Sequence, residues 1–101
     1  MENTKSLLDV LHSDMKQADW KVIVKPIPHT EFHFDIELHR NNECILTSVN
    51  DLDTWDEFSF NEHKFDLNVW KDEEWSAAIY PVVENSTITD QWIDIPIVLL
   101  A

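Results

Sequence analysis

Residues 32–49 read FHFDIELHRNNECILTSV, and their pattern gives the clearest indication of the fold class. Apolar and ionisable residues alternate over residues 32–39, which is the period of a strand that buries one face. The pair Asn41-Asn42 separates this run from a second alternating run over residues 43–49. Two asparagines between two such runs indicate a two-residue hairpin turn. The stretch therefore predicts two antiparallel strands joined by a tight turn.

This turn also predicts which residues of the two strands lie opposite each other. Its central pairs place Arg40 opposite Glu43 and His39 opposite Cys44. On the apolar side, the predicted pairs are Leu38 with Ile45, Ile36 with Thr47 and Phe34 with Val49. We expect the apolar side of the first strand to line the core beneath an N-terminal helix: Phe32, Phe34, Ile36 and Leu38.

The rest of the chain predicts one helix and further strands. Residues 4–19 place Leu7, Leu8, Leu11, Met15 and Ala18 at helical spacing. Alternating or apolar runs predict strands at residues 20–25, 58–60, 65–70, 75–83 and 92–100, whereas residues 51–58 look like an acidic loop or short helical turn. The predicted fold is α+β: an N-terminal helix packed on a mainly antiparallel sheet of about five to six strands. We expect residues 1–101 to form a single compact domain.

The charge balance narrows the classes of partner. The chain of 101 residues has 20 acids and 7 Lys and Arg, for a net charge of −13. Residues 41–101 carry thirteen of these acids and only two bases, Lys64 and Lys71. Because phosphate binding requires lysine and arginine, direct binding of nucleic acid or of an anionic membrane is disfavoured. A partner with a positive surface fits the charge better.

The lack of glycine and the single cysteine exclude several kinds of site. The chain has no glycine, which excludes glycine-rich phosphate loops and the glycine-flanked nucleophile elbow. Its single cysteine, Cys44, cannot form an internal disulfide or build a cysteine-based zinc site alone.

The N-terminal residues lack the apolar core of a signal peptide, and no apolar run approaches the roughly 18–20 residues that cross a membrane. We therefore expect a cytoplasmic protein.

The polar side of the first strand has two interpretations. His33, Asp35, Glu37 and His39 share one strand face, and alternate residues on a strand lie close enough to hold one metal ion. Cys44 beside His39 adds another ligand type. The same alternation is typical of any half-solvated antiparallel strand, which we favour. We therefore expect no metal, no cofactor and no catalytic residue, and a metal-dependent enzyme is the alternative.

Tryptophans within acidic turns predict a binding surface. Trp55 lies in the run DLDTWDEF, and Trp75 ends the run KDEEW. Each tryptophan alone is explained by burial near a strand end, but exposed tryptophan among carboxylates is typical of a hot spot that binds a basic protein. The predicted partner-binding residues are Asp51, Asp53, Trp55, Asp56, Glu57, Asp72, Glu73, Glu74 and Trp75.

In its acidic and compact character the chain is similar to small bacterial immunity proteins and to phage-encoded inhibitors. We therefore expect an acidic, non-enzymatic inhibitor, namely an immunity protein that neutralises a cognate nuclease-type toxin by covering its basic active site. One alternative is a phage-encoded inhibitor that mimics nucleic acid, as anti-CRISPR proteins do. The other is the metal-dependent enzyme using His33, Asp35, Glu37 and His39.

Overall fold

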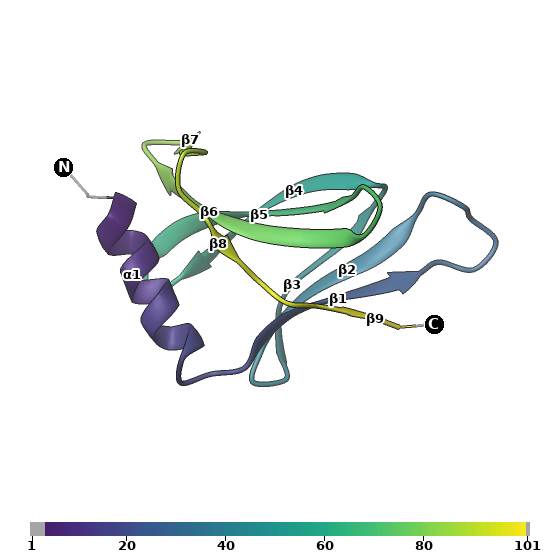
Figure 1. Cartoon of the computed structure of the whole chain (residues 1–101), viewed down its shortest axis with the longest axis horizontal. Coiled ribbons are helices and arrows are strands. Elements are labelled where there is room, and N and C mark those ends of the chain that lie inside the picture. The colour runs from purple at the N-terminus through teal and green to yellow at the C-terminus, as the bar shows by residue number, and fades with distance from the viewer. Residues whose placement is uncertain (1–3, 101) are drawn as a thin grey trace.

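The computed structural model describes residues 4–100 and contains one helix followed by nine strands in two sheets (Figure 1). The fold is therefore α+β, as the sequence predicts, and mainly β, but its nine strands form two sheets instead of the predicted single sheet of about five to six strands. The elements are α1 (Thr4–Met15), β1 (Trp20–Pro26), β2 (Phe34–Arg40), β3 (Glu43–Asn50), β4 (Asp53–Phe60), β5 (His63–Lys71), β6 (Trp75–Val83), β7 (Ser86–Thr87), β8 (Ile93–Asp94) and β9 (Ile97–Leu99).

The first three strands form sheet A, the next five form sheet B, and the chain returns to sheet A with β9. Sheet A has the strand order β3-β2-β1-β9, in which β9 pairs parallel to β1. Sheet B has the antiparallel order β4-β5-β6-β7, and β8 also pairs with β6. The strands of both sheets run roughly along the long axis of the molecule, and the two sheets lie on either side of it (Figure 1). Each strand thus has one side toward the other sheet and one side outward.

The core lies between the two sheets. Trp20 of β1 contacts Phe60 of β4 edge to face, with ring centroids 5.2 Å apart. Phe34 of β2 makes the same kind of contact with Trp75 of β6, at 4.9 Å. The most deeply buried side chains come from both sheets and from α1: Leu11, Val22, Val24, Ile36, Leu38, Phe65, Leu67, Val69 and Ile79.

Helix α1 lies at one end of the molecule rather than over the inner face of β2 (Figure 1). Its buried stripe of Leu7, Leu8 and Leu11 packs toward the core, and α1 contacts β6. The prediction that the apolar side of β2 lies beneath the helix is therefore wrong, because sheet B takes that place. The helix in the described part of the chain is not long and apolar enough to cross a membrane.

The first hairpin confirms the turn and corrects the register beyond it. Arg40 pairs with Glu43 and His39 pairs with Cys44, as predicted. A β-bulge then shifts the register, so Leu38 lies opposite Leu46 and the next pairs are displaced by one residue. The bulge adds a residue to β3, which the turn alone does not predict. Of the four predicted core residues, Ile36 and Leu38 are buried and Phe34 is half-buried.

Phe32 is the exception, because its side chain is 57% exposed. It precedes β2, whose first residue is Phe34. The residues before the strand form a turn in which the Thr30 hydroxyl donates to the carbonyl oxygen of Ile27. The alternation in the sequence therefore begins one period earlier than the strand does.

The predicted acidic loop at residues 51–58 is mostly a strand. Strand β4 runs from Asp53 to Phe60 and pairs with β5 along its whole length. The turn to β5 contains two residues, Asn61 and Glu62, whereas the predicted strands at residues 58–60 and 65–70 leave four residues between them. Both have positive φ angles, 52° and 66°. The four carboxylates among residues 51–57 made this strand look like a loop, although Thr54 and Phe58 are buried.

The predicted strand at residues 92–100 is divided into β8 and β9. The amide of Ile95 donates to the carbonyl oxygen of Ala77 in sheet B, and the carbonyl oxygen of Pro96 accepts from the amide of Val22 in sheet A. Because proline has no N–H to donate, a continuous ladder ends there. The segment therefore crosses from one sheet to the other and seals the core with Ile95, which is buried.

Candidate functional site

The outward side of sheet B carries aromatic and acidic side chains together. Cross-strand pairing places Trp55 opposite Asn68 and Asn68 opposite Ala78, so these residues share one side of the sheet. The neighbouring row on the same side is formed by Glu57, Asp66 and Tyr80. We call this surface the acidic–aromatic face; its members are Asp53, Trp55, Glu57, Asp66, Tyr80, Trp92 and Asp94.

Three aromatic rings form a row across this face. The centroid of Trp55 lies 5.2 Å from that of Tyr80, and Tyr80 lies 6.2 Å from Trp92. Trp55 and Trp92 nevertheless remain 49% and 52% exposed. The small residue Ala78 on the same side is fully buried, which indicates that the rings lie over the sheet. The row therefore offers a flat apolar surface on a regular scaffold.

Carboxylates surround this row. Asp53 accepts a hydrogen bond of 2.9 Å from the side-chain amide of Asn68, and Asp66 accepts one from the hydroxyl of Thr87. Glu57 lies 3.6 Å from Lys64, the one base that the strand register places on this side among the described residues. Asp94 lies opposite Ala78 and is exposed. The face is thus strongly negative, and hydrogen bonds hold two of its acids in position.

The two predicted acidic segments lie at the same end of sheet B. Asp53 pairs with Trp70, and the amide of Lys71 donates to the carbonyl oxygen of Leu52 at 2.9 Å. This contact brings residues 51–53 beside the turn at residues 72–74. The acids of both segments are exposed: Asp51, Asp53, Asp72, Glu73 and Glu74. The structure therefore brings together acids that are about twenty residues apart in the sequence.

Two of the predicted partner-binding residues lie elsewhere. Trp75 is half-buried against Phe34, and the ammonium of Lys71 lies 6.0 Å from the centroid of its ring. Asp56 is half-buried and accepts hydrogen bonds from the Ser48 hydroxyl, at 3.2 Å, and from the Asn50 amide, at 3.1 Å. Asp56 therefore joins β4 to β3 at the edge of the core, and Trp75 closes the core between the sheets.

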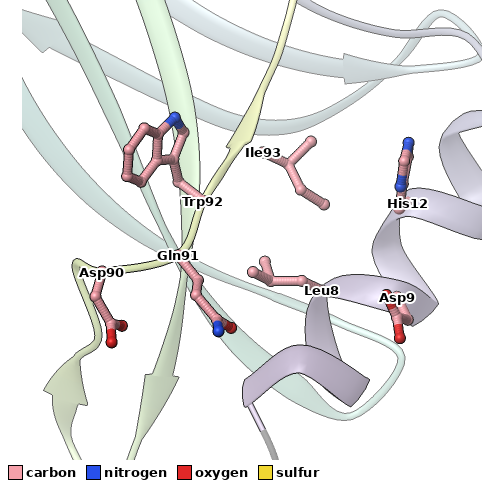
Figure 2. A pocket seen from close by; sticks show the side chains of 7 residues that line it. All are labelled: Leu8, Asp9, His12, Asp90, Gln91, Trp92 and Ile93. Atoms are coloured by element: carbon pink, nitrogen blue, oxygen red, sulfur yellow. The ribbon is translucent and has the colours of Figure 1, made fainter.

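A groove borders the acidic–aromatic face at Trp92 (Figure 2). It has a volume of about 530 Å³ and lies between α1 and the segment at residues 90–93. Leu8, Asp9 and His12 come from the helix side, whereas the ring of Trp92 points away from the helix (Figure 2). The groove therefore extends the exposed surface of Trp92 toward two further acids, Asp9 and Asp90.

Sequence reasoning identified Trp55 as exposed but missed Tyr80, Trp92 and Asp66. The alternation of Ala78, Tyr80 and Val82 places Tyr80 on the outward side once β6 is paired. Trp92 had no such signal, because its contact with Tyr80 depends on the path of the segment between β7 and β8. Only the three-dimensional arrangement shows that the three rings form one row.

A second polar group lies on the outward side of sheet A. The Nε2 atom of His39 lies 2.8 Å from Oε1 of Glu37, and Nζ of Lys25 lies 3.2 Å from Oε2 of the same carboxylate. These two contacts, that of His39 above all, hold the pKa of Glu37 below its usual range. Cys44 lies opposite His39. Of the other predicted ligands, His33 precedes β2 and is exposed, and Asp35 lies opposite Lys25.

Comparison with known proteins gives no assignment. No protein-family model, no curated protein and no solved structure matches the chain. Its function must therefore be inferred from its own surfaces.

Proposed function

We propose that this chain is an acidic inhibitor that binds a basic protein through the acidic–aromatic face. In the form we favour, it is a cytoplasmic bacterial immunity protein that covers the basic active site of a cognate nuclease-type toxin. The observation that carries the proposal is the row of Trp55, Tyr80 and Trp92 among carboxylates on one side of sheet B.

The chemistry of the row suits a surface rich in arginine. Tryptophan and tyrosine are enriched among the residues that dominate binding energy at interfaces. A guanidinium stacks on such rings, and the attraction is worth roughly 2 kcal/mol when the contact excludes water. Around the rings, Glu57, Asp66 and Asp94 provide acceptors for the donors of the same arginines. A basic active-site cleft that contains arginines would supply both the guanidinium planes that stack on the rings and the N–H groups that donate to the carboxylates.

The net charge of −13 supports rapid association with such a partner. Complementary charge accelerates docking, up to roughly 10⁸–10⁹ M⁻¹s⁻¹ at low salt. The acids at residues 51–53 and 72–74 lie at one end of the same sheet and extend the negative field beyond the aromatic row. We assign the exposed acids to steering and the three rings to holding the complex.

The first experiment compares two variants with equal charge changes. Glu57→Lys/Asp94→Lys alters the acidic–aromatic face, whereas Glu31→Lys/Glu43→Lys replaces two exposed acids outside sheet B. Proteins captured from the native host with the wild-type chain are identified by mass spectrometry, expressed alone and tested for binding. We expect a basic nuclease whose association with the face variant is at least about tenfold slower and less dependent on salt. The control variant should associate more nearly as the wild type does.

A second pair of variants tests the aromatic row. Trp55→Ala/Trp92→Ala should weaken binding by about 2 kcal/mol or more, or roughly thirtyfold, mainly through faster dissociation. The inhibition of nuclease activity should fall in parallel. A captured partner that is not basic, or one that binds all variants equally, would contradict the proposal.

The alternative with the same physics is a phage-encoded inhibitor that mimics nucleic acid, in the manner of anti-CRISPR proteins. Its carboxylates would occupy a groove that normally binds phosphates. The two forms predict different genome neighbourhoods, namely a toxin gene beside an immunity gene and a prophage around a mimic. They also predict different partners, a single cognate toxin in one case and a host or phage-defence nuclease in the other.

A further inference from the structure

The strongest feature that the proposed function does not use is the group of three side chains on the outward side of sheet A. The carboxylate of Glu37, the imidazole of His39 and the thiol of Cys44 place one ligand atom each within 4.8 Å of the other two. They belong to β2 and β3 of sheet A, whereas the acidic–aromatic face lies on sheet B. We call these residues the Glu37–His39–Cys44 cluster.

We propose that the Glu37–His39–Cys44 cluster is a binding site for a thiophilic divalent cation, of which zinc is the natural example. The cation takes three protein ligands from the cluster. Its fourth position is open to water or to a group from a bound molecule, as in three-ligand zinc sites.

The distances suit this coordination after small side-chain rotations. In a tetrahedral zinc site with bonds of about 2.0–2.3 Å, the ligand atoms lie roughly 3.3–3.8 Å from one another. The cluster atoms are all within 4.8 Å of one another, and Nε2 of His39 and Oε1 of Glu37 are 2.8 Å apart. Binding therefore requires the thiol to move inward by about 1 Å and the imidazole and carboxylate to separate by about half of that.

The hairpin turn and the strand period explain why these three residues meet, and a β-bulge lies beside them. His39 and Glu37 are two apart on β2 and therefore lie on the same side of the sheet. Cys44 pairs with His39 through the turn, and the register then shifts between Leu38 and His39, so Glu37 pairs with Thr47. Bulges redirect side chains and are common next to functional sites.

The types of ligand select the cation. Sulfur and imidazole nitrogen favour zinc over magnesium or calcium, which prefer oxygen. Cys44 is exposed and is the only cysteine of the chain, so no internal disulfide competes for its sulfur. Its thiol donates only a weak hydrogen bond, to the carbonyl oxygen of Leu46 at 3.4 Å. The sulfur is thus accessible to a cation from solvent.

The surroundings hold the carboxylate in position. The ammonium of Lys25 contacts Oε2 of Glu37 at 3.2 Å and leaves Oε1 directed at His39. Outer contacts of this kind orient metal ligands. Lys21 lies opposite His39 but contacts Asp19 at 3.6 Å, which offsets its charge. A thiolate and a carboxylate in the site would balance the charge of zinc.

The test is a titration of the purified full chain with cobalt(II), a spectroscopic substitute for zinc, without thiol reductants and without oxygen. We expect binding of one cobalt per chain with a sulfur-to-cobalt charge-transfer absorption, which zinc then displaces. Cys44→Ser should abolish this absorption. His39→Gln and Glu37→Gln should each weaken zinc binding by at least about tenfold, the loss that even outer partners of metal ligands cause.

Two matched variants test the alternative set of ligands. His33→Gln and Asp35→Asn remove residues of the same types from the same stretch of sequence but outside the cluster, and we expect zinc affinity within about threefold of the wild type. Circular dichroism checks that each variant is folded. The proposal is overturned if cobalt gives no charge-transfer absorption, or if His33→Gln weakens zinc binding as much as His39→Gln does. Equal alkylation of Cys44 with and without zinc would also contradict it.

Discussion

Replacing Asp14 with alanine removes one carboxylate that joins α1 to sheet A. Its Oδ2 accepts a hydrogen bond of 2.6 Å from the indole nitrogen of Trp20 and one of 2.7 Å from Nε of Arg40. Its Oδ1 accepts a third, of 2.8 Å, from Nη2 of Arg40. Trp20 is only 3% exposed. The substitution therefore leaves a buried indole N–H without its acceptor.

The expected loss follows mainly from this indole. A buried donor left without a partner costs about 1–3 kcal/mol, so we take about 2 kcal/mol. The guanidinium of Arg40 is about one third exposed and can be rehydrated, so we add nothing for it. For a domain of this size, about 2 kcal/mol corresponds to a fall in Tm of roughly 10 °C.

The assay is urea unfolding at pH 7, followed by far-ultraviolet circular dichroism, with Trp20→Phe as the matched background. Trp20→Phe removes the donor itself, so Asp14→Ala should cost at least about 1 kcal/mol less in that background than in the wild type. If Asp14→Ala costs less than about 0.5 kcal/mol, or if the two substitutions are additive, the indole hydrogen bond does not join the helix to the sheet.

The same carboxylate predicts a dependence on pH. The hydrogen bond from Arg40 is the main cause that holds the pKa of Asp14 below its usual range. A lowered pKa in the folded state gives a stabilisation that is complete above the unfolded pKa of about 3.9. This stabilisation is lost as the pH falls through the folded pKa. The difference in stability between the wild type and Asp14→Ala should therefore be constant from about pH 7 to pH 5 and shrink at more acidic pH.

Four further substitutions test other parts of the fold. Glu62→Gly should raise the free energy of unfolding by about 0.5–1 kcal/mol, because Glu62 has a φ of 66° that glycine adopts without strain; no gain in the urea midpoint would contradict this. Trp75→Ala should cost about 2 kcal/mol or more through its contact with Phe34, whereas Trp92→Ala, at an exposed site, should cost less than about 1 kcal/mol. Equal losses in thermal unfolding would show that the two rings are not buried differently. Ile95→Ala should cost about 2–4 kcal/mol, because this buried residue lies where the chain crosses between the sheets; an unchanged Tm would refute that role.

The hairpin shows how far local sequence determines structure. Asn41 and Asn42 have φ angles of 52° and 68°, so the turn and its first two pairs follow from residues that tolerate this conformation. The bulge beyond them was not predicted, although adjacent apolar residues at 45 and 46 interrupt the alternation of β3. Because one extra residue moves every later pair, a correct turn does not ensure a correct register.

The candidate surface shows a different limit. Trp55 was predicted to be exposed from its acidic neighbours, and the structure places it at 49% exposure. Trp75 has equally acidic neighbours but is half-buried, because Phe34 of the other sheet packs against it. Sequence neighbours report on the local charge, whereas burial depends on what the other sheet brings near. The same reason explains why the row with Tyr80 and Trp92 could not be predicted.

We infer a binding function, rather than simple solubility, from the position of the acids. Solubility requires only that charges be exposed, and scattered charges on turns repel one another less than a dense group does. In this chain, acids surround three clustered rings on a paired sheet, where the backbone is already ordered and binding costs less conformational entropy. Two half-exposed tryptophans add nothing to solubility. The combination therefore supports the proposal of a partner that covers the rings and neutralises the acids, and the charge-matched variants test this proposal.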